Sequence, residues 1–137
     1  MSEQVTVFEA VGGMPYFRSL VERFYQGVSQ DPLLRPMYPA DLNGAVERLA
    51  LFLGQYWGGP DTYSLQRGHP RLRMRHMPFR VDRAARDAWL GHMVAALEAD
   101  PPDEPVRSAM IEYFLRSAEF LRNVDESDDP AGEPVVN

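Results

Sequence analysis

The sequence predicts an all-α domain, and three observations lead to this fold class. Apolar residues recur at the three- and four-residue spacing of a helix in four long segments. Polar and apolar residues nowhere alternate for long enough to predict a strand. Glycine- or proline-containing breaks separate the segments, as they commonly do between helices. The 137 residues, 45% of them hydrophobic, suffice for one domain with its own core.

The first part of the chain is expected to form a short helix followed by a long one. Residues 8–11 form the short helix, which stops at Gly12-Gly13. Pro15 suits the first turn of the long helix, where a backbone donor is not needed. The break at Asp31-Pro32 ends this helix. Its expected inward residues are Phe17, Leu20, Val21, Phe24, Tyr25 and Val28.

A second long helix is expected to begin near Asp41 or Asn43, since either side chain can cap it. A short turn over residues 33–38 precedes this helix, and Gly58-Gly59-Pro60 stops it. Its expected inward residues are Ala45, Val46, Leu49, Phe52, Leu53, Tyr56 and Trp57. Residues 58–70 hold few regularly spaced apolar residues. We therefore expect an extended loop there, which in a compact domain is often functional.

The last part of the chain is expected to contain two more long helices and a tail. Residues 71–77 would make one or two helical turns, and Asp82 is expected to cap the helix that follows. The final helix extends over about residues 103–123. The expected inward residues are Ala85, Trp89, Leu90, Met93, Val94 and Leu97, then Val106, Met110, Ile111, Phe114, Leu115, Ala118 and Leu121. We expect one domain over residues 1–124 and a disordered acidic tail over 125–137.

The charge is distributed unevenly along the chain. All 14 basic residues are arginine, and the net charge is −6. Seven arginines beside a single acid, Asp82, give residues 67–86 a local charge of +6. These arginines are Arg67, Arg71, Arg73, Arg75, Arg80, Arg83 and Arg86. A nucleic-acid-binding protein is more uniformly basic, so the pattern favours a local anion site and no nucleic-acid partner.

Composition excludes several classes of protein. The chain has no cysteine, which excludes disulfides, thiolate metal sites and a cysteine nucleophile. No stretch of 18 apolar residues is present, so we expect no integral membrane segment. Residues 1–7 lack the charged and apolar regions of a secretory signal, so we expect a cytoplasmic location.

The histidines are the candidate metal ligands. His69, His76 and His92 do not have the spacing of a metalloprotease motif, and each could be purely structural. His76 differs because arginines and apolar residues surround it in the segment Arg73 to Phe79. An imidazole facing an apolar cavity can ligate a metal, and arginines pair with carboxylates. A haem requires both, an axial ligand for its iron and partners for its carboxylates. A surface arginine cluster with a half-buried histidine would give the same sequence pattern.

Aromatic residues add support for a bound polar ligand. They occur in several of the expected helices, and buried tyrosine and tryptophan need partners for their O–H and N–H groups. Tyr25 and Trp89 fall on the apolar faces of their helices. Several donors that converge in one helical domain indicate a polar ligand in an apolar pocket, although ordinary packing explains most such residues equally well.

Longer motifs resemble a known family. These are the run from Phe52 to Pro60, then Tyr63, and the run from Arg67 to His76. Val11-Gly12-Gly13 precedes them and Asp87-Ala88-Trp89-Leu90 follows. Together they closely resemble the truncated haemoglobins of group II over about residues 8–122. The resemblance implies a two-over-two helical sandwich around a haem, with a long loop before the iron ligand.

The resemblance also implies roles for individual residues. His76 takes the proximal position and ligates the iron of haem b. Tyr25, Tyr38 and Trp89 face the distal ligand, and Leu49 lies near them. Ala45 takes the position of the distal histidine of ordinary globins and cannot donate a hydrogen bond. The implied haem contacts are Phe24, Phe52, Arg48, Tyr63, His69, Met74, Arg75, Phe79 and Arg80, with Arg48, Tyr63, His69, Arg75 and Arg80 as candidates for the propionate edge.

The resemblance implies a protein that binds dioxygen and other diatomic ligands at a pentacoordinate iron. It also permits an enzyme that uses the same haem for nitric-oxide dioxygenation or peroxidase-like chemistry, with a reductase or other electron donor as partner. A homo-oligomer is compatible with the sequence. A haem-free helical interaction module is the alternative of a different class, with the arginine segment docking an acidic partner or nucleic acid, although the acidic remainder of the chain argues against nucleic acid.

Overall fold

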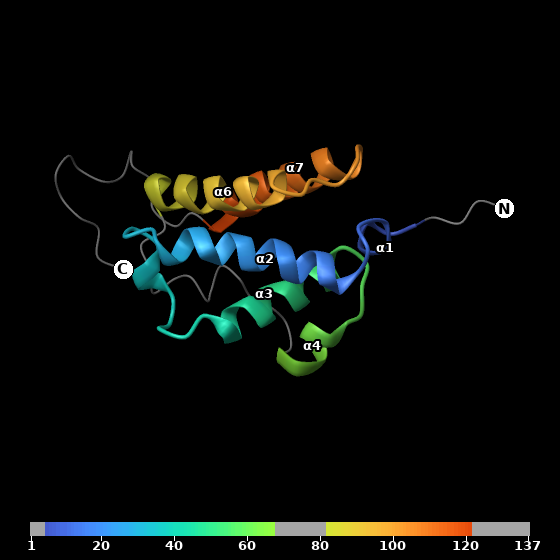
Figure 1. Ribbon diagram of the computed structural model, residues 1–137, viewed down its shortest axis with the longest axis horizontal. Coiled ribbons are helices and arrows are strands. Elements are labelled where there is room, and N and C mark those ends of the chain that lie inside the picture. Colours follow the sequence, from blue (N-terminus) through green and yellow to red (C-terminus); the bar gives the residue numbers. More distant parts are fainter. Residues whose placement is uncertain (1–4, 68–81, 122–137) are drawn as a thin grey trace.

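The computed structural model describes residues 5–67 and 82–121, and in this part of the chain every regular element is a helix (Figure 1). The all-α class expected from the sequence is therefore confirmed. The helices are α1 (Val7–Ala10), α2 (Met14–Ser29), the 3-10 helix η1 (Arg35–Met37), α3 (Asn43–Tyr56), α4 (Thr62–Arg67), α6 (Arg83–Glu98) and α7 (Val106–Leu121).

The long helices form two packed pairs. Helix α2 packs against both α3 and α6, and α6 packs against α7. In Figure 1, α6 and α7 lie side by side on one side of α2, and α3 lies on the other. This is the two-over-two arrangement that the resemblance implies. It leaves the inner faces of all four long helices pointing toward a shared core.

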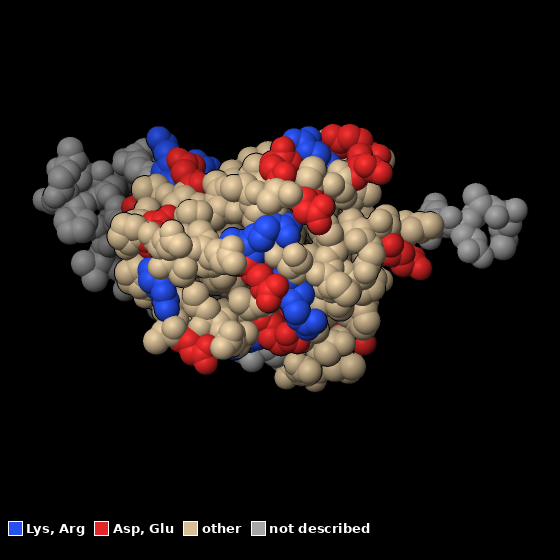
Figure 2. Space-filling model, in the orientation of Figure 1, with Lys and Arg blue, Asp and Glu red and all other residues tan. Residues whose placement is uncertain are grey.

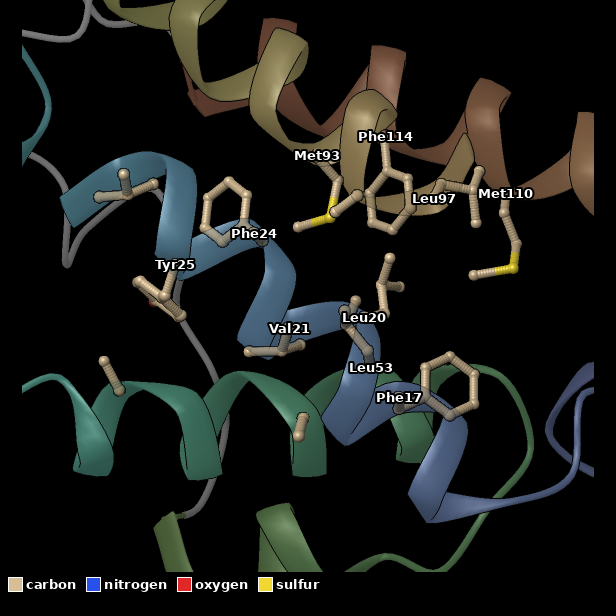
Figure 3. Close-up of a cluster of buried hydrophobic side chains, with 14 of the residues drawn as sticks. Phe17, Leu20, Val21, Phe24, Tyr25, Leu53, Met93, Leu97, Met110 and Phe114 are labelled. Carbon is tan, nitrogen blue, oxygen red and sulfur yellow. The ribbon is translucent and has the colours of Figure 1, made fainter. Parts of the chain in front are cut away.

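The core is centred on the inner face of α2. All six residues expected to point inward from this helix are buried, and the hydrophobic spacing is therefore confirmed. In Figure 3, Phe24 of α2 meets Met93 of α6 and Phe114 of α7 between the two layers. The positive φ angles of Gly12 and Gly13, 99° and 84°, turn the chain from α1 into α2, a conformation that other residues rarely adopt.

The two predicted helix caps have different outcomes. The carboxylate of Asp82 accepts a hydrogen bond from the backbone N–H of Ala85 at 2.9 Å, so the predicted cap of α6 is confirmed. The cap predicted for α3 is wrong, because Leu42 is the N-cap residue and offers no side-chain acceptor. Asp41, which precedes the N-cap residue, instead accepts from the backbone N–H of Asn43, the first residue of the helix, at 2.9 Å.

The structure corrects the loop expected over residues 58–70, because α4 occupies part of it. Helix α4 has six residues, too few to show a repeating apolar pattern. Tertiary contacts stabilise it instead: Tyr63 is buried, and the Gln55 side chain accepts from the backbone N–H of Ser64 at 2.9 Å.

Two residues expected to point inward are exposed. Tyr56, the last residue of α3, is 53% exposed, and Leu115 of α7 is 48% exposed. Both lie at the margin of an apolar stripe, where neighbouring helices decide which residues are covered. Helix α7 begins at Val106, three residues later than expected, directly after Pro105. The helical turns expected over residues 71–77 and the tail over 125–137 lie outside the described residues.

Ion pairs connect neighbouring helices at the surface. Arg18 of α2 pairs with Glu47 of α3 at 2.9 Å, and Arg107 of α7 pairs with Glu98 of α6 at 2.5 Å. Figure 2 shows acidic and basic side chains interspersed over this face. Such exposed pairs contribute little to stability, because water screens their attraction. None of the helices within residues 5–67 and 82–121 has the length and apolar character needed to cross a membrane.

Candidate functional site

A cavity of about 210 Å³ lies inside the helical domain. Its described walls come from α2, α3, α4, α6, α7 and the segment after η1. Most of the lining is apolar or aromatic. The residues that line it are Tyr25, Tyr38, Pro39, Ala45, Arg48, Leu49, Phe52, Leu53, Tyr63, Trp89, Met93, Tyr113, Phe114 and Ser117. A cavity of this composition is typical of a site for a mostly apolar ligand.

Three hydrogen-bond donors meet in the wall of this cavity. The rings of Tyr25 and Tyr38 pack edge to face with their centroids 5.4 Å apart. Trp89 approaches Tyr38 closely enough to lower the pKa of its phenol, and because an indole N–H can only donate, the Tyr38 oxygen is on the accepting side of this contact. Sequence reasoning named all three residues, and the structure brings them together from α2, the segment after η1, and α6.

Burial keeps the two cavity tyrosines, Tyr25 and Tyr38, in their neutral, proton-donating form. Loss of solvent raises the pKa of Tyr38 to about 12, although the nearby Trp89 opposes the shift. Burial also raises the pKa of Tyr25 well above its ordinary value, with the nearby Arg48 opposing the shift. Near neutral pH both phenols therefore carry the proton that a hydrogen-bond donor needs.

Helix α3 supplies the apolar side of the cavity and its positive charge. Ala45 and Leu49 lie one turn apart on the wall, and Ala45 carries no donor. Among the described lining residues, Arg48 carries the charge. A Cβ on Gly44 would lie 2.9 Å from a guanidinium nitrogen of Arg48, so the glycine leaves room for this side chain to fold back.

The remaining predicted haem contacts divide into two groups. Phe52 and Tyr63 line the cavity, with ring centroids 5.3 Å apart. Phe24 is fully buried and packs against Tyr25 and Trp89, at centroid distances of 5.0 and 5.5 Å, so it supports these two cavity residues. The predicted iron ligand His76 lies outside the described residues, as do His69, Met74, Arg75, Phe79 and Arg80.

Sequence reasoning missed several lining residues. Tyr113 and Ser117 of α7 are the main ones, and the Ser117 side chain lowers the pKa of Tyr113 against the larger effect of burial. They stand four residues apart and so share a helix face, which is the signal that could have identified them. Met93, Leu53 and Phe114 were expected only as core residues, and Pro39, which follows the turn expected over residues 33–38, was not expected in the site.

Comparison with known proteins identifies the family. A family model described as bacterial-like globin matches residues 6–123. The chain belongs to this family. It is 35% identical to the group 2 truncated haemoglobin YjbI of Bacillus subtilis over 122 residues, which cover 89% of this chain and 92% of that protein. The match places this globin among the group 2 truncated haemoglobins.

Solved structures support the same assignment. The X-ray structure of a thermostable haemoglobin from Thermobifida fusca is 52% identical, with a TM-score of 0.85 over 88% of this chain and 98% of that one. The truncated oxygen-avid haemoglobin from Bacillus subtilis is 34% identical, with a TM-score of 0.82 over 87% of this globin and all of that chain. The truncated globin fold that the resemblance implies is therefore confirmed.

Membership of a haemoglobin family implies a haem, and the cavity's side chains fit one. Phe52, Leu49 and Met93 offer apolar contact to a macrocycle. Arg48 offers a guanidinium to a propionate, a pairing with favourable geometry. No group of three or more metal-binding side chains lies together among the described residues, so a metal ion on its own has no site there.

Proposed function

We propose that this globin holds haem b in the cavity and binds dioxygen and other diatomic ligands there, with His76 as the one protein ligand of a five-coordinate iron. The observation that carries the proposal is the meeting of Tyr25, Tyr38 and Trp89 in an otherwise mainly apolar wall. The haem supplies an iron with one open coordination position, where a diatomic ligand binds. Arg48 would hold a propionate of the haem.

The three donors determine how strongly such a ligand is held. Trp89 and Tyr38 are packed in the wall within interaction distance of each other, so their polar groups are already held in place. A ligand that gains partial negative charge is stabilised by donors that need no reorganisation. Ala45 cannot donate, so this work falls to Tyr25, Tyr38 and Trp89. Slow dioxygen release follows, in line with the oxygen-avid relative from Bacillus subtilis.

A redox activity at the same haem is the second candidate. Oxidisable phenol and indole rings form part of the cavity wall, and this observation favours one-electron chemistry with peroxide. The described cavity wall contains no histidine that could act as a distal acid–base group, which favours ligand binding as the first candidate.

Replacement of His76 tests the proposed iron ligand. The His76→Gly variant should lose the ordinary ligation spectrum and regain it when imidazole is added, because free imidazole can occupy the vacated space. His92→Gly is the matched control, since His92 hydrogen bonds to Asp31 at 2.7 Å and lies outside the lining. A wild-type Soret spectrum in His76→Gly without imidazole would show that His76 is not the ligand.

A further inference from the structure

The connection between α2 and α3 carries Tyr38 into the cavity wall, at one end of the domain (Figure 1). Tyr38 follows η1, and its φ and ψ angles of −122° and 154° are those of an extended chain. No backbone N–H within residues 5–67 and 82–121 donates to the carbonyls of residues 38, 39 and 40. The position of Tyr38 therefore depends on contacts other than the backbone hydrogen bonds of a regular element.

The side chain of Arg35 supplies the missing donors. One terminal nitrogen of its guanidinium, Nη1, donates to the carbonyl of Tyr38 at 3.3 Å and to that of Pro39 at 3.0 Å. The other terminal nitrogen, Nη2, donates to the carbonyl of Ala40 at 2.8 Å. A guanidinium presents its donors in a rigid planar fork, so one side chain can join three successive carbonyls. No carboxylate among the described residues forms an ion pair with Arg35, which leaves this fork to the backbone.

The start of η1 is anchored as well, so Arg35 reaches out from a fixed position. The backbone N–H of Arg35 donates to the carbonyl of Asp31 at 2.8 Å. The carboxylate of Asp31 accepts from the backbone N–H of Leu33 at 2.9 Å and lies 2.7 Å from Nε2 of His92 on α6. Leu34 is buried in the core. Together these contacts hold the turn before Tyr38 against α6.

The carbonyls that Arg35 holds belong to residues of the cavity wall. Tyr38 and Pro39 both line the cavity, whereas Arg35 lies outside its lining. The Tyr38 ring packs edge to face against Tyr25, with the centroids 5.4 Å apart. Rotation of the backbone at Tyr38 would break the hydrogen bonds to Arg35 and move the phenol away from Tyr25. The three hydrogen bonds therefore fix the place of this phenol in the wall.

We propose that Arg35 is a positioning residue for the ligand site, which acts through the phenol of Tyr38 and determines how much more firmly this globin holds dioxygen than carbon monoxide. The proposal rests on the haem function proposed above. It assigns control of ligand preference to a residue outside the cavity lining.

The preference follows from the charge that each ligand gains when it binds. Dioxygen gains partial negative charge, so a donor that is already in place stabilises it. Carbon monoxide gains much less charge and depends less on such a donor. Without Arg35, the carbonyls of residues 38–40 lose three hydrogen bonds and the phenol of Tyr38 is no longer held at one position. Dioxygen then loses a preorganised donor, and carbon monoxide loses little.

The test measures the dissociation rates of both gases from the haem-loaded protein. Dioxygen release from Arg35→Ala should be at least about five-fold faster than from the wild type, the lower limit for one buried polar group that loses its partner. The dissociation rate of carbon monoxide should change much less. A variant that had only lost stability would not separate the two gases in this way.

A double-mutant cycle shows whether Arg35 acts through Tyr38. Tyr38→Phe removes the phenolic O–H and keeps the ring. If Arg35 acts by placing this phenol, Arg35→Ala should cause no further acceleration of dioxygen release in the Tyr38→Phe background. A role of Arg35 that does not involve the phenol would accelerate release by the same factor in both backgrounds.

Two other arginine variants complete the experiment. Arg18→Ala is the matched control and should behave like the wild type, since Arg18 pairs with Glu47 at the surface and lies outside the cavity lining. Arg35→Lys keeps the charge, but its single nitrogen cannot reproduce the fork. It should release dioxygen at a rate between those of the wild type and Arg35→Ala. If Arg35→Ala does not fold, Arg35→Lys carries the same cycle.

Two results would overturn this role of Arg35 while the haem function stands. One is a haem-loaded Arg35→Ala protein that releases dioxygen at the wild-type rate. The other is an equal acceleration by Arg35→Ala with and without the phenol of Tyr38. A wild-type protein that takes up no haem would instead overturn the proposed function, and this inference with it.

Discussion

Replacement of Trp89 by phenylalanine removes one hydrogen-bond donor from the distal wall and keeps an aromatic ring there. Trp89 packs between Phe24 and Phe114, with centroid distances of 5.5 and 6.2 Å. A phenylalanine at this position retains much of that contact. The indole N–H, which lies near Tyr38, is lost. The variant therefore isolates the donor from the packing.

The expected effect on dioxygen release follows from the free energy of one buried hydrogen bond. Leaving a buried polar group without its partner costs about 1–3 kcal/mol. Because about 1.4 kcal/mol corresponds to a factor of ten, dissociation from Trp89→Phe should be roughly 5- to 140-fold faster than from the wild type. Stopped-flow displacement of dioxygen by carbon monoxide measures this rate directly.

The chain provides a matched control in its other tryptophan. The indole nitrogen of Trp57 is buried without a hydrogen-bond partner among the described residues, and Trp57 lies outside the cavity lining. Trp57→Phe should therefore leave the dissociation rate unchanged. If Trp89→Phe releases dioxygen at the wild-type rate while its thermal unfolding is normal, Trp89 does not hold the ligand.

Three further changes test the packing and the electrostatics of the fold. Gly27→Ala should lower the unfolding free energy by about 1–3 kcal/mol, because its Cβ would lie 2.5 Å from Nδ1 of His92. Gly91→Ala is the control, since nothing lies within 4 Å of the Cβ added there. Equal stabilities of the two variants in a denaturant titration would refute the clash. The hydrogen bond from His92 lowers the pKa of Asp31. The wild type should therefore have a higher unfolding free energy than Asp31→Asn at neutral pH, and this difference should shrink as the pH falls below the ordinary aspartate pKa, about 4. A difference that stays constant in denaturant titrations from pH 6 to pH 3 would argue against this pair. Asp82→Ala removes the cap of α6 and should cost about 0.5–2 kcal/mol, with an unchanged thermal midpoint as the contrary result.

The long helices could be predicted because their apolar spacing repeats over several turns. On α2 the pattern identified every inward residue, since the helix is covered on one side by α3 and on the other by α6. Helix α4 could not be found in this way, because six residues complete fewer than two turns. The exposure of Tyr56 depends on how far neighbouring helices extend over it. The spacing of apolar residues within α3 carries no information about that.

The site was predicted in part from the residues and in larger part from the resemblance. Helical spacing placed Tyr25 and Trp89 on inward faces, but only the resemblance assigned them to one site with Tyr38, which follows η1. Tyr113 and Ser117 carry no motif, and their place in the cavity depends on the rotation of α7 against α6. That rotation is a tertiary property which α7 alone does not specify.

The absorption spectrum of the purified globin tests the central claim most directly. The account predicts a red protein with a Soret band, whose ferrous form changes spectrum when dioxygen or carbon monoxide is added. This result would mean that a haem occupies the cavity and that a diatomic ligand binds beside the three donors. A colourless protein that takes up no added haemin would contradict the account and leave the helical interaction module as the explanation of this chain.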